Sequence, residues 1–148
     1  MKLLFSLVLF LSFLFINNSF AQQDTALINK YGADKNGMKK YVLVFLKSGK
    51  TKIEDKEKLA EIQKGHMDNI KKLADDGKLV LAGPFLDKTD LRGIFILNVA
   101  DIKEAEELVN TDPAVVAGAL EMELHPWYGS AALMEIPEIH KKLQKSDF

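Results

Sequence analysis

Two segments of the sequence, residues 41–47 (YVLVFLK) and 91–99 (LRGIFILNV), are apolar at both odd and even positions. Their β-branched, aromatic and aliphatic side chains are typical of β-strands. Successive side chains of a strand point to opposite faces of a sheet, so a strand that is apolar at both parities must be covered on both faces. The chain must therefore fold with these two segments as central strands of a covered sheet.

The remaining elements follow from hydrophobic periodicity and from end signals. Gly77 is well placed just beyond the end of a helix, and Asp101 with Glu104 forms a variant capping box at the start of another. The order β-α-β-β-α-β predicts an α+β, ferredoxin-like fold with an antiparallel four-stranded sheet. Besides the central strands, the predicted elements are a helix over 55–76, a strand over 78–85, a helix that starts at 101 and a strand over 119–127.

The two outer strands carry signals of a sheet edge. Pro84 lacks an N–H group, so it is tolerated at an edge or at the end of a strand. The last strand alternates, which suits an edge or a wet cavity. Its apolar residues are Leu120, Met122 and Leu124, and its polar residues are Glu121, Glu123 and His125.

Two helices cover only one face of a four-stranded sheet, so the second apolar face needs another cover. Left in water it would form a larger apolar patch than a monomer usually shows. The same face of a second subunit is the preferred cover, which predicts a two-fold homodimer. The alternative cover is the C-terminal segment 131–139 (AALMEIPEI).

The N-terminus has the layout of a secretory signal peptide. Lys2 precedes a largely apolar run of 14 residues from Leu3 to Ile16, and the small residues Ser19 and Ala21 follow. The run is short for a membrane anchor, which needs roughly 20 residues. Residues 1–21 are therefore expected to be cleaved, leaving a periplasmic or secreted protein without a membrane segment.

Removal of residues 1–21 from the 148 leaves 127, which suits a single domain. We expect a flexible leader over 22–37, the domain over 38–130, and a C-terminal extension over 131–148 with a short helix from about Pro137. Without Lys2 the 20 basic residues become 19, against 21 acidic ones. This balance does not favour nucleic acid as a partner, and the absence of cysteine excludes a thiolate nucleophile or metal ligand.

His66 interrupts the apolar stripe of the first helix. It stands four residues after Ile62 and four before Ile70, where a helix normally buries an apolar side chain. A structural histidine bonded to a carbonyl is one interpretation. The other is a general acid or base, since imidazole titrates near neutral pH. Gly65, just before it, would let another chain or a ligand come close, or permit a local bend.

Asp112 is the candidate partner of His66. It stands in Thr-Asp-Pro after the second helix, where Asp followed by Pro also reads as a helix N-cap and first residue. The two roles are compatible, because capping uses the carboxylate only in part. In the ferredoxin-like fold both helices pack on one sheet face, so residues of the two can meet.

These features together resemble the YciI-like (YCII-related) family. The resemblance rests on the run from His66 to Pro84 (HMDNIKKLADDGKLVLAGP), on Asp-Pro at 112, on Gly118 and on His-Pro-Trp at 125–127. It implies a dimeric α+β barrel and an active site built on a His–Asp dyad, here His66 and Asp112. It also implies a Gly-Pro turn beside the pocket, here Gly83 and Pro84. A related member is a dehydrochlorinase of a chlorinated hydroxyquinol; the signal peptide departs from the usual pattern.

Two other groups of residues are weaker candidates. Glu121, Glu123 and His125 share a strand face, but such neighbours stand ~7 Å apart, and a solvated edge is the preferred interpretation over a metal site. Trp127 is a candidate pocket wall, with core packing as the preferred alternative. No metal or cofactor is predicted.

The sequence leaves two functions open. The first is a cofactor-free acid/base enzyme, a lyase, isomerase or dehydrochlorinase-like protein, acting on a small organic molecule through His66 and Asp112. The second is a non-catalytic domain of the same fold that binds a small ligand or serves as a scaffold.

Overall fold

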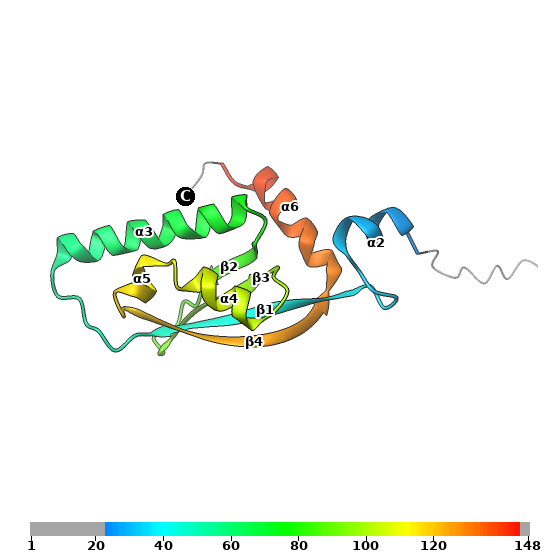
Figure 1. The fold of residues 1–148 in the computed structure, drawn as a ribbon. Coiled ribbons are helices and arrows are strands. Elements are labelled where there is room, and N and C mark those ends of the chain that lie inside the picture. The colour runs from blue at the N-terminus through cyan, green and yellow to red at the C-terminus, as the bar shows by residue number, and fades with distance from the viewer. Residues whose placement is uncertain (1–22, 146–148) are drawn as a thin grey trace, which may run out of the picture.

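The computed structural model describes residues 23–145, so the predicted signal peptide lies outside the described residues. Within them, no helix has the length and apolar character needed to cross a membrane. Figure 1 shows the helices lying mainly over one side of a curved sheet. In chain order the elements are α2 (Thr25–Tyr31), β1 (Met38–Ser48), α3 (Lys56–Asp75), β2 (Leu79–Pro84), β3 (Leu91–Leu97), α4 (Ile102–Val109), α5 (Pro113–Val116), β4 (Leu120–Ser130), the 3₁₀ helix η2 (Ala131–Glu135) and α6 (Ile136–Leu143).

The four strands form one antiparallel sheet in the order β2-β3-β1-β4. The prediction of an α+β, ferredoxin-like fold is therefore confirmed, with β1 and β3 in the centre and β2 and β4 at the edges. β1 and β4 are longer than predicted, because they pair along their whole length, from Met38 opposite Ser130 to Ser48 opposite Leu120. Backbone pairing thus carries both strands past their apolar stretches.

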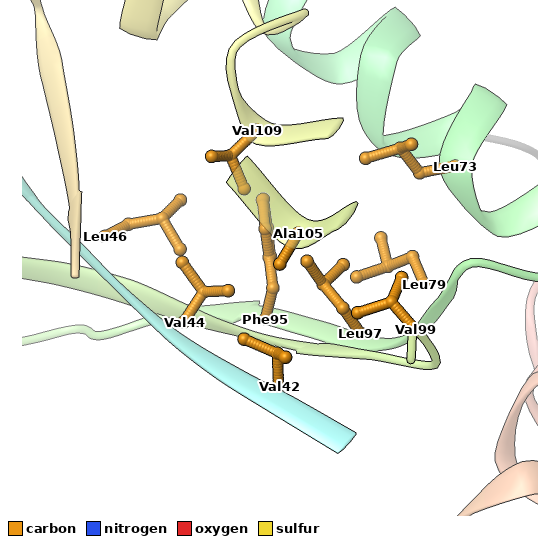
Figure 2. Close-up of a cluster of buried hydrophobic side chains, with 10 residues drawn as sticks. All are labelled: Val42, Val44, Leu46, Leu73, Leu79, Phe95, Leu97, Val99, Ala105 and Val109. Atoms are coloured by element: carbon orange, nitrogen blue, oxygen red, sulfur yellow. The ribbon is translucent and has the colours of Figure 1, made fainter. Parts of the chain in front are cut away.

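The helix-covered face holds the larger hydrophobic core, drawn in Figure 2. Alternate residues of β1 and β3 point into it and meet side chains of α3 and α4. Val44 and Leu97, on the two central strands, are completely buried. Burial of this apolar surface is the main free energy that holds the helices on the sheet. The core residues are Val42, Val44, Leu46, Leu73, Leu79, Phe95, Leu97, Val99, Ala105 and Val109.

The second face of the sheet is covered at one end by the chain itself. Tyr41, Val80 and Ile96 are buried there, and Leu133 and Met134 of η2 pack against them. This is the cover that the sequence analysis had ranked below a second subunit. The rest of the face is not covered in this way, and Leu43, Phe45 and Ile94 remain partly exposed.

Part of the segment 22–37, for which the sequence predicts a flexible leader, forms the helix α2. The Asp24 side chain caps this helix by accepting hydrogen bonds from the backbone N–H groups of Ala26 and Leu27. Gly32, with a φ of 65°, ends it. The loop that follows is tied to β4, since Tyr128 donates its hydroxyl proton to Asp34.

Candidate functional site

His66 lies on the face of α3 that packs against the sheet. Its residue exposure is only 8%, and its ring is nearly parallel to that of Phe95, with the ring centroids 6.2 Å apart. Phe95 belongs to the central strand β3 and to the main core. The predicted position of His66 on the buried stripe is therefore correct, and the aromatic ring beneath it limits how far the imidazole can move.

Asp112 lies at the junction of α4 and α5 and has no exposed surface. One carboxylate oxygen, Oδ1, accepts the backbone N–H of Ala114 at 2.8 Å, so Asp112 is the N-cap of α5, with Pro113 next to it at the start of the helix. The other oxygen, Oδ2, lies 2.6 Å from Nδ1 of His66. Asp112 thus performs both roles that the sequence left open.

The close packing of α5 on α3 brings these two residues together. Gly65 is the contact point: a Cβ atom built on it would lie 2.8 Å from Cγ of Pro113, which is closer than such atoms normally approach. Only a residue without a side chain lets Pro113 sit so near the helix axis. The glycine that weakens α3 locally is therefore what allows Asp112, the neighbour of Pro113, to reach His66.

The hydrogen bond to Asp112 determines what the imidazole can do. An ionised carboxylate only accepts hydrogen bonds, so Nδ1 must carry a proton. In the neutral ring the other nitrogen, Nε2, then has a free lone pair. Among the described residues Nε2 has no hydrogen-bond partner, and the one fully buried side-chain N or O atom without a partner is Asn69 Oδ1. The His66 side chain as a whole keeps 11% of its surface exposed.

The edge strand β2 carries exposed residues on the side of the sheet where His66 lies. Ala82 and Pro84 point to the helix-covered side, because they lie opposite Phe95 and Gly93 of β3, yet both are exposed. Gly83 points to the opposite side, across from Ile94. The predicted Gly-Pro turn therefore ends the strand at an uncovered margin of the sheet, one strand away from the aromatic ring that supports His66.

Trp127 does not lie with these residues. It belongs to the cluster on the second face of the sheet, where its ring centroid is 5.9 Å from that of Tyr41. Within one chain the sheet separates it from His66, so core packing, the alternative named in the sequence analysis, describes its contacts here.

Glu123 and His125 of β4 take part in ion pairs. The Glu123 carboxylate accepts hydrogen bonds from Lys47 and from His125, the latter at 2.7 Å. Lys47 first and His125 second hold the pKa of Glu123 below its usual value, because both stabilise the charged form. Across residues 23–145 no group of three or more His, Cys, Asp or Glu side chains is arranged to hold a metal ion.

Asn69 and Thr111 also join α3 to the α4–α5 junction, and the sequence analysis missed them. Asn69 donates from Nδ2 to Thr111 Oγ1 at 2.8 Å. The signal was their spacing, because Asn69 follows His66 by three residues on the same helix face and Thr111 directly precedes Asp112.

We expect Gly65→Ala to lower the free energy of unfolding, although alanine in an exposed helix would raise it by about 1 kcal/mol. The added methyl group collides with Pro113, and overpacking typically costs about 1–3 kcal/mol. Pro113→Ala removes the colliding ring. Denaturant titration of the double variant should therefore show less destabilisation than the sum of the single variants, and strict additivity would mean that the two residues are not in contact.

Three matches relate this chain to known proteins. A family model described as the YCII-related domain matches residues 40–128. The chain is 30% identical over 63 residues to "Uncharacterized protein YjpA" of Bacillus subtilis (strain 168), a match that covers 43% of this chain and 72% of that protein. Among solved structures it is similar to 5-chloro-2-hydroxyhydroquinone dehydrochlorinase (TftG) from Burkholderia phenoliruptrix AC1100, in complex with 2,5-dihydroxybenzoquinone. That similarity has a TM-score of 0.45 and 19% identity, and it covers 59% of this chain and 92% of the other.

The family match extends over more than half of the chain and includes both His66 and Asp112. The chain belongs to the YCII-related domain family.

Proposed function

We propose that this chain is a cofactor-free acid/base enzyme that acts on a small organic molecule. Nε2 of His66 takes a proton from the substrate and returns it. The observation that supports this most directly is the 2.6 Å contact between Nδ1 and Asp112 Oδ2, combined with an Nε2 atom that has no partner within the described chain. A histidine that served only to fill the core would be expected to have both of its ring nitrogens hydrogen-bonded within the protein.

Asp112 would act in two ways during the reaction. Before proton transfer it keeps the proton on Nδ1, so that Nε2 is the basic atom. After the transfer its negative charge stabilises the imidazolium. Because Asp112 has no exposed surface, water screens this attraction little. Loss of a leaving group such as chloride would make the reaction a dehydrochlorinase-like elimination, and return of the proton to another atom would make it an isomerisation.

The open margin of β2 is the route by which a small molecule would reach Nε2. The backbone of this strand also suggests a donor for negative charge that develops on the substrate. The N–H group of Phe85 donates to the backbone carbonyl of Arg92 on β3. Along an antiparallel pair the N–H groups point alternately toward the partner strand and away from it. The N–H of Gly83 therefore also points toward β3, and the N–H of Ala82 points away from it. Pro84 has no N–H, which leaves Ala82 as the candidate donor at this edge.

A non-catalytic role is the second candidate, and the burial of His66 against Phe95 favours it. In that case the ring and Asp112 serve to lock α5 onto α3, and the domain binds a small ligand or serves as a scaffold. The two candidates differ in what is lost when the imidazole is replaced, since a structural histidine affects stability and a catalytic one affects turnover.

We expect His66→Gln to abolish turnover while the chain stays folded. The measurement is proton exchange and product formation in D₂O, followed by NMR with a panel of chlorinated hydroxyquinols and enolisable lactones as probes. Asp112→Asn is the matched variant, because asparagine caps a helix as well as aspartate does but cannot stabilise the imidazolium. In Asp112→Asn we expect turnover to fall by roughly 10²–10⁴-fold, the usual range for acid–base catalysis.

Circular dichroism and thermal unfolding of both variants provide the control for folding. If His66→Gln turned over the probes as fast as the wild type, the acid/base assignment would be wrong. If neither protein reacted but His66→Gln melted well below the wild type, the scaffold role would be favoured instead.

We also propose that the uncovered part of the second sheet face binds a second copy of the chain. Leu43, Phe45 and Ile94 are apolar and partly exposed there. A two-fold axis would place these three residues of one copy against the same three residues of the other. Ile94→Glu should then convert a dimer into a monomer in light scattering. Leu86→Glu is the control, since Leu86 is 96% exposed in a loop. A wild-type protein with monomer mass would contradict this proposal.

Finally, we propose that the protein is exported and cleaved after Ala21, into the periplasm or the medium. Mass spectrometry of the exported protein should give an N-terminus at Gln22. A chain that keeps Met1 in the cell fraction would show that the apolar N-terminal run is not a cleaved signal.

A further inference from the structure

A chain of hydrogen bonds links α3 to the α4–α5 junction one helical turn away from the His66–Asp112 contact. Asn69 Nδ2 donates to Thr111 Oγ1 at 2.8 Å. Thr111 Oγ1 in turn donates to the backbone carbonyl of Leu108, near the end of α4, at 2.7 Å. Asn69 therefore reaches the last turn of α4 through the hydroxyl group of Thr111.

The direction of these bonds follows from the number of protons available. A threonine hydroxyl has one proton, and the carbonyl of Leu108, which can only accept, uses it. The hydroxyl must then accept from Asn69, so the amide has to present its NH₂ group. This orientation leaves Oδ1 of Asn69 fully buried without a hydrogen-bond donor, the one such side-chain atom among residues 23–145.

An unpartnered oxygen in a residue that is only 9% exposed costs free energy. A leucine at this position would fill the same space without that cost. Stability alone therefore does not account for Asn69, and buried polar atoms that remain unpaired call for another explanation.

We propose that Asn69 and Thr111 are positioning residues for the dyad. Two consecutive residues of the junction, Thr111 and Asp112, bond to two residues on successive turns of α3, Asn69 and His66. A single bond would leave the junction free to pivot about it, whereas two bonds set its orientation. The Asn69–Thr111 bond thereby holds Asp112 Oδ2 at Nδ1 of His66. Its importance for catalysis rests on the proposed function, but its effect on the ring does not.

The test uses the imidazole itself as the probe, in the ¹⁵N-labelled full chain. A proton shared between Nδ1 and a carboxylate and shielded from water should give a low-field NMR resonance, assigned to His66 by its loss in His66→Gln. We expect Thr111→Val, which has the same shape without the hydroxyl, to broaden this resonance or abolish it. Thr111→Ser is the matched control, because it retains the hydroxyl and should retain the resonance.

Asn69→Leu separates positioning from packing. It removes both the bond to Thr111 and the unpartnered oxygen, so we expect the midpoint of thermal unfolding to stay the same or rise. The low-field resonance should nevertheless be lost or broadened. A merely structural role predicts the opposite, a lower midpoint with an unchanged resonance.

The outcomes distinguish this inference from the proposed function. A resonance that persists in both Thr111→Val and Asn69→Leu would overturn the positioning role while the dyad stands. Its loss in Thr111→Ser as well as in Thr111→Val would also overturn it, because the hydroxyl would not be the decisive group. Absence of the resonance from the wild type would instead contradict the dyad, and with it the acid/base function.

Discussion

The complete burial of the Asp112 carboxylate is the constraint around which the helical layer is arranged. A charge without water must be paired and hydrogen-bonded within the chain, and the two oxygens of Asp112 are satisfied from two elements, Ala114 N–H of α5 and His66 Nδ1 of α3. The carboxylate thus joins the start of a very short helix to the middle of the longest one. Removal of either donor without a replacement would leave a buried charge partly unsatisfied, which is strongly destabilising, whereas His66→Gln keeps an N–H group that can donate. A buried ion pair is nonetheless weak evidence for net stability, because an apolar replacement of both partners is often as stable.

The sheet imposes a second requirement, which the chain meets differently on its two faces. On one face α3 and α4 bury the alternate residues of β1 and β3. On the other face η2 reaches back over the first residues of β1 and β2. The family match ends at residue 128, before η2 and α6 begin. This chain therefore covers one end of that face with residues outside the matched segment, and any sheet-to-sheet contact with a second copy is confined to the other end.

Much of this could be predicted from the sequence, because the informative patterns are local. Alternation and β-branched residues indicated the strands, and helical spacing placed His66 on the buried side of α3. That Asp112 would meet it followed from the topology only as an expectation. The alternation of β4 also indicated the face on which Trp127 lies. Trp127 is two residues after His125 and four after Glu123, so it shares their face of the sheet and not that of Leu124. The cap of α2 by Asp24 was equally visible, but the segment lacked the apolar periodicity on which helix prediction depends.

What could not be predicted are contacts that depend on the close approach of elements. Helical spacing places Asn69 on the same face of α3 as His66, but its pairing with Thr111 depends on how near Gly65 lets Pro113 come to α3, and no periodicity encodes that distance.

The position of His66 between core and margin would suit the two opposing needs of the acid/base group that we propose. Phe95 and the helices exclude water from Nδ1, which strengthens its bond to Asp112, since screening is weak in a dry interior. Nε2 must instead be reachable, because proton transfer needs contact with the reacting molecule. An imidazole buried over the middle of the sheet would be too deep for a substrate to reach. An imidazole on the solvent side of α3 would be too far from Asp112 to bond to its carboxylate. Under the proposed function, the exposed Ala82 and Pro84 opposite Phe95 and Gly93 mark the margin of the sheet from which a small molecule would approach Nε2.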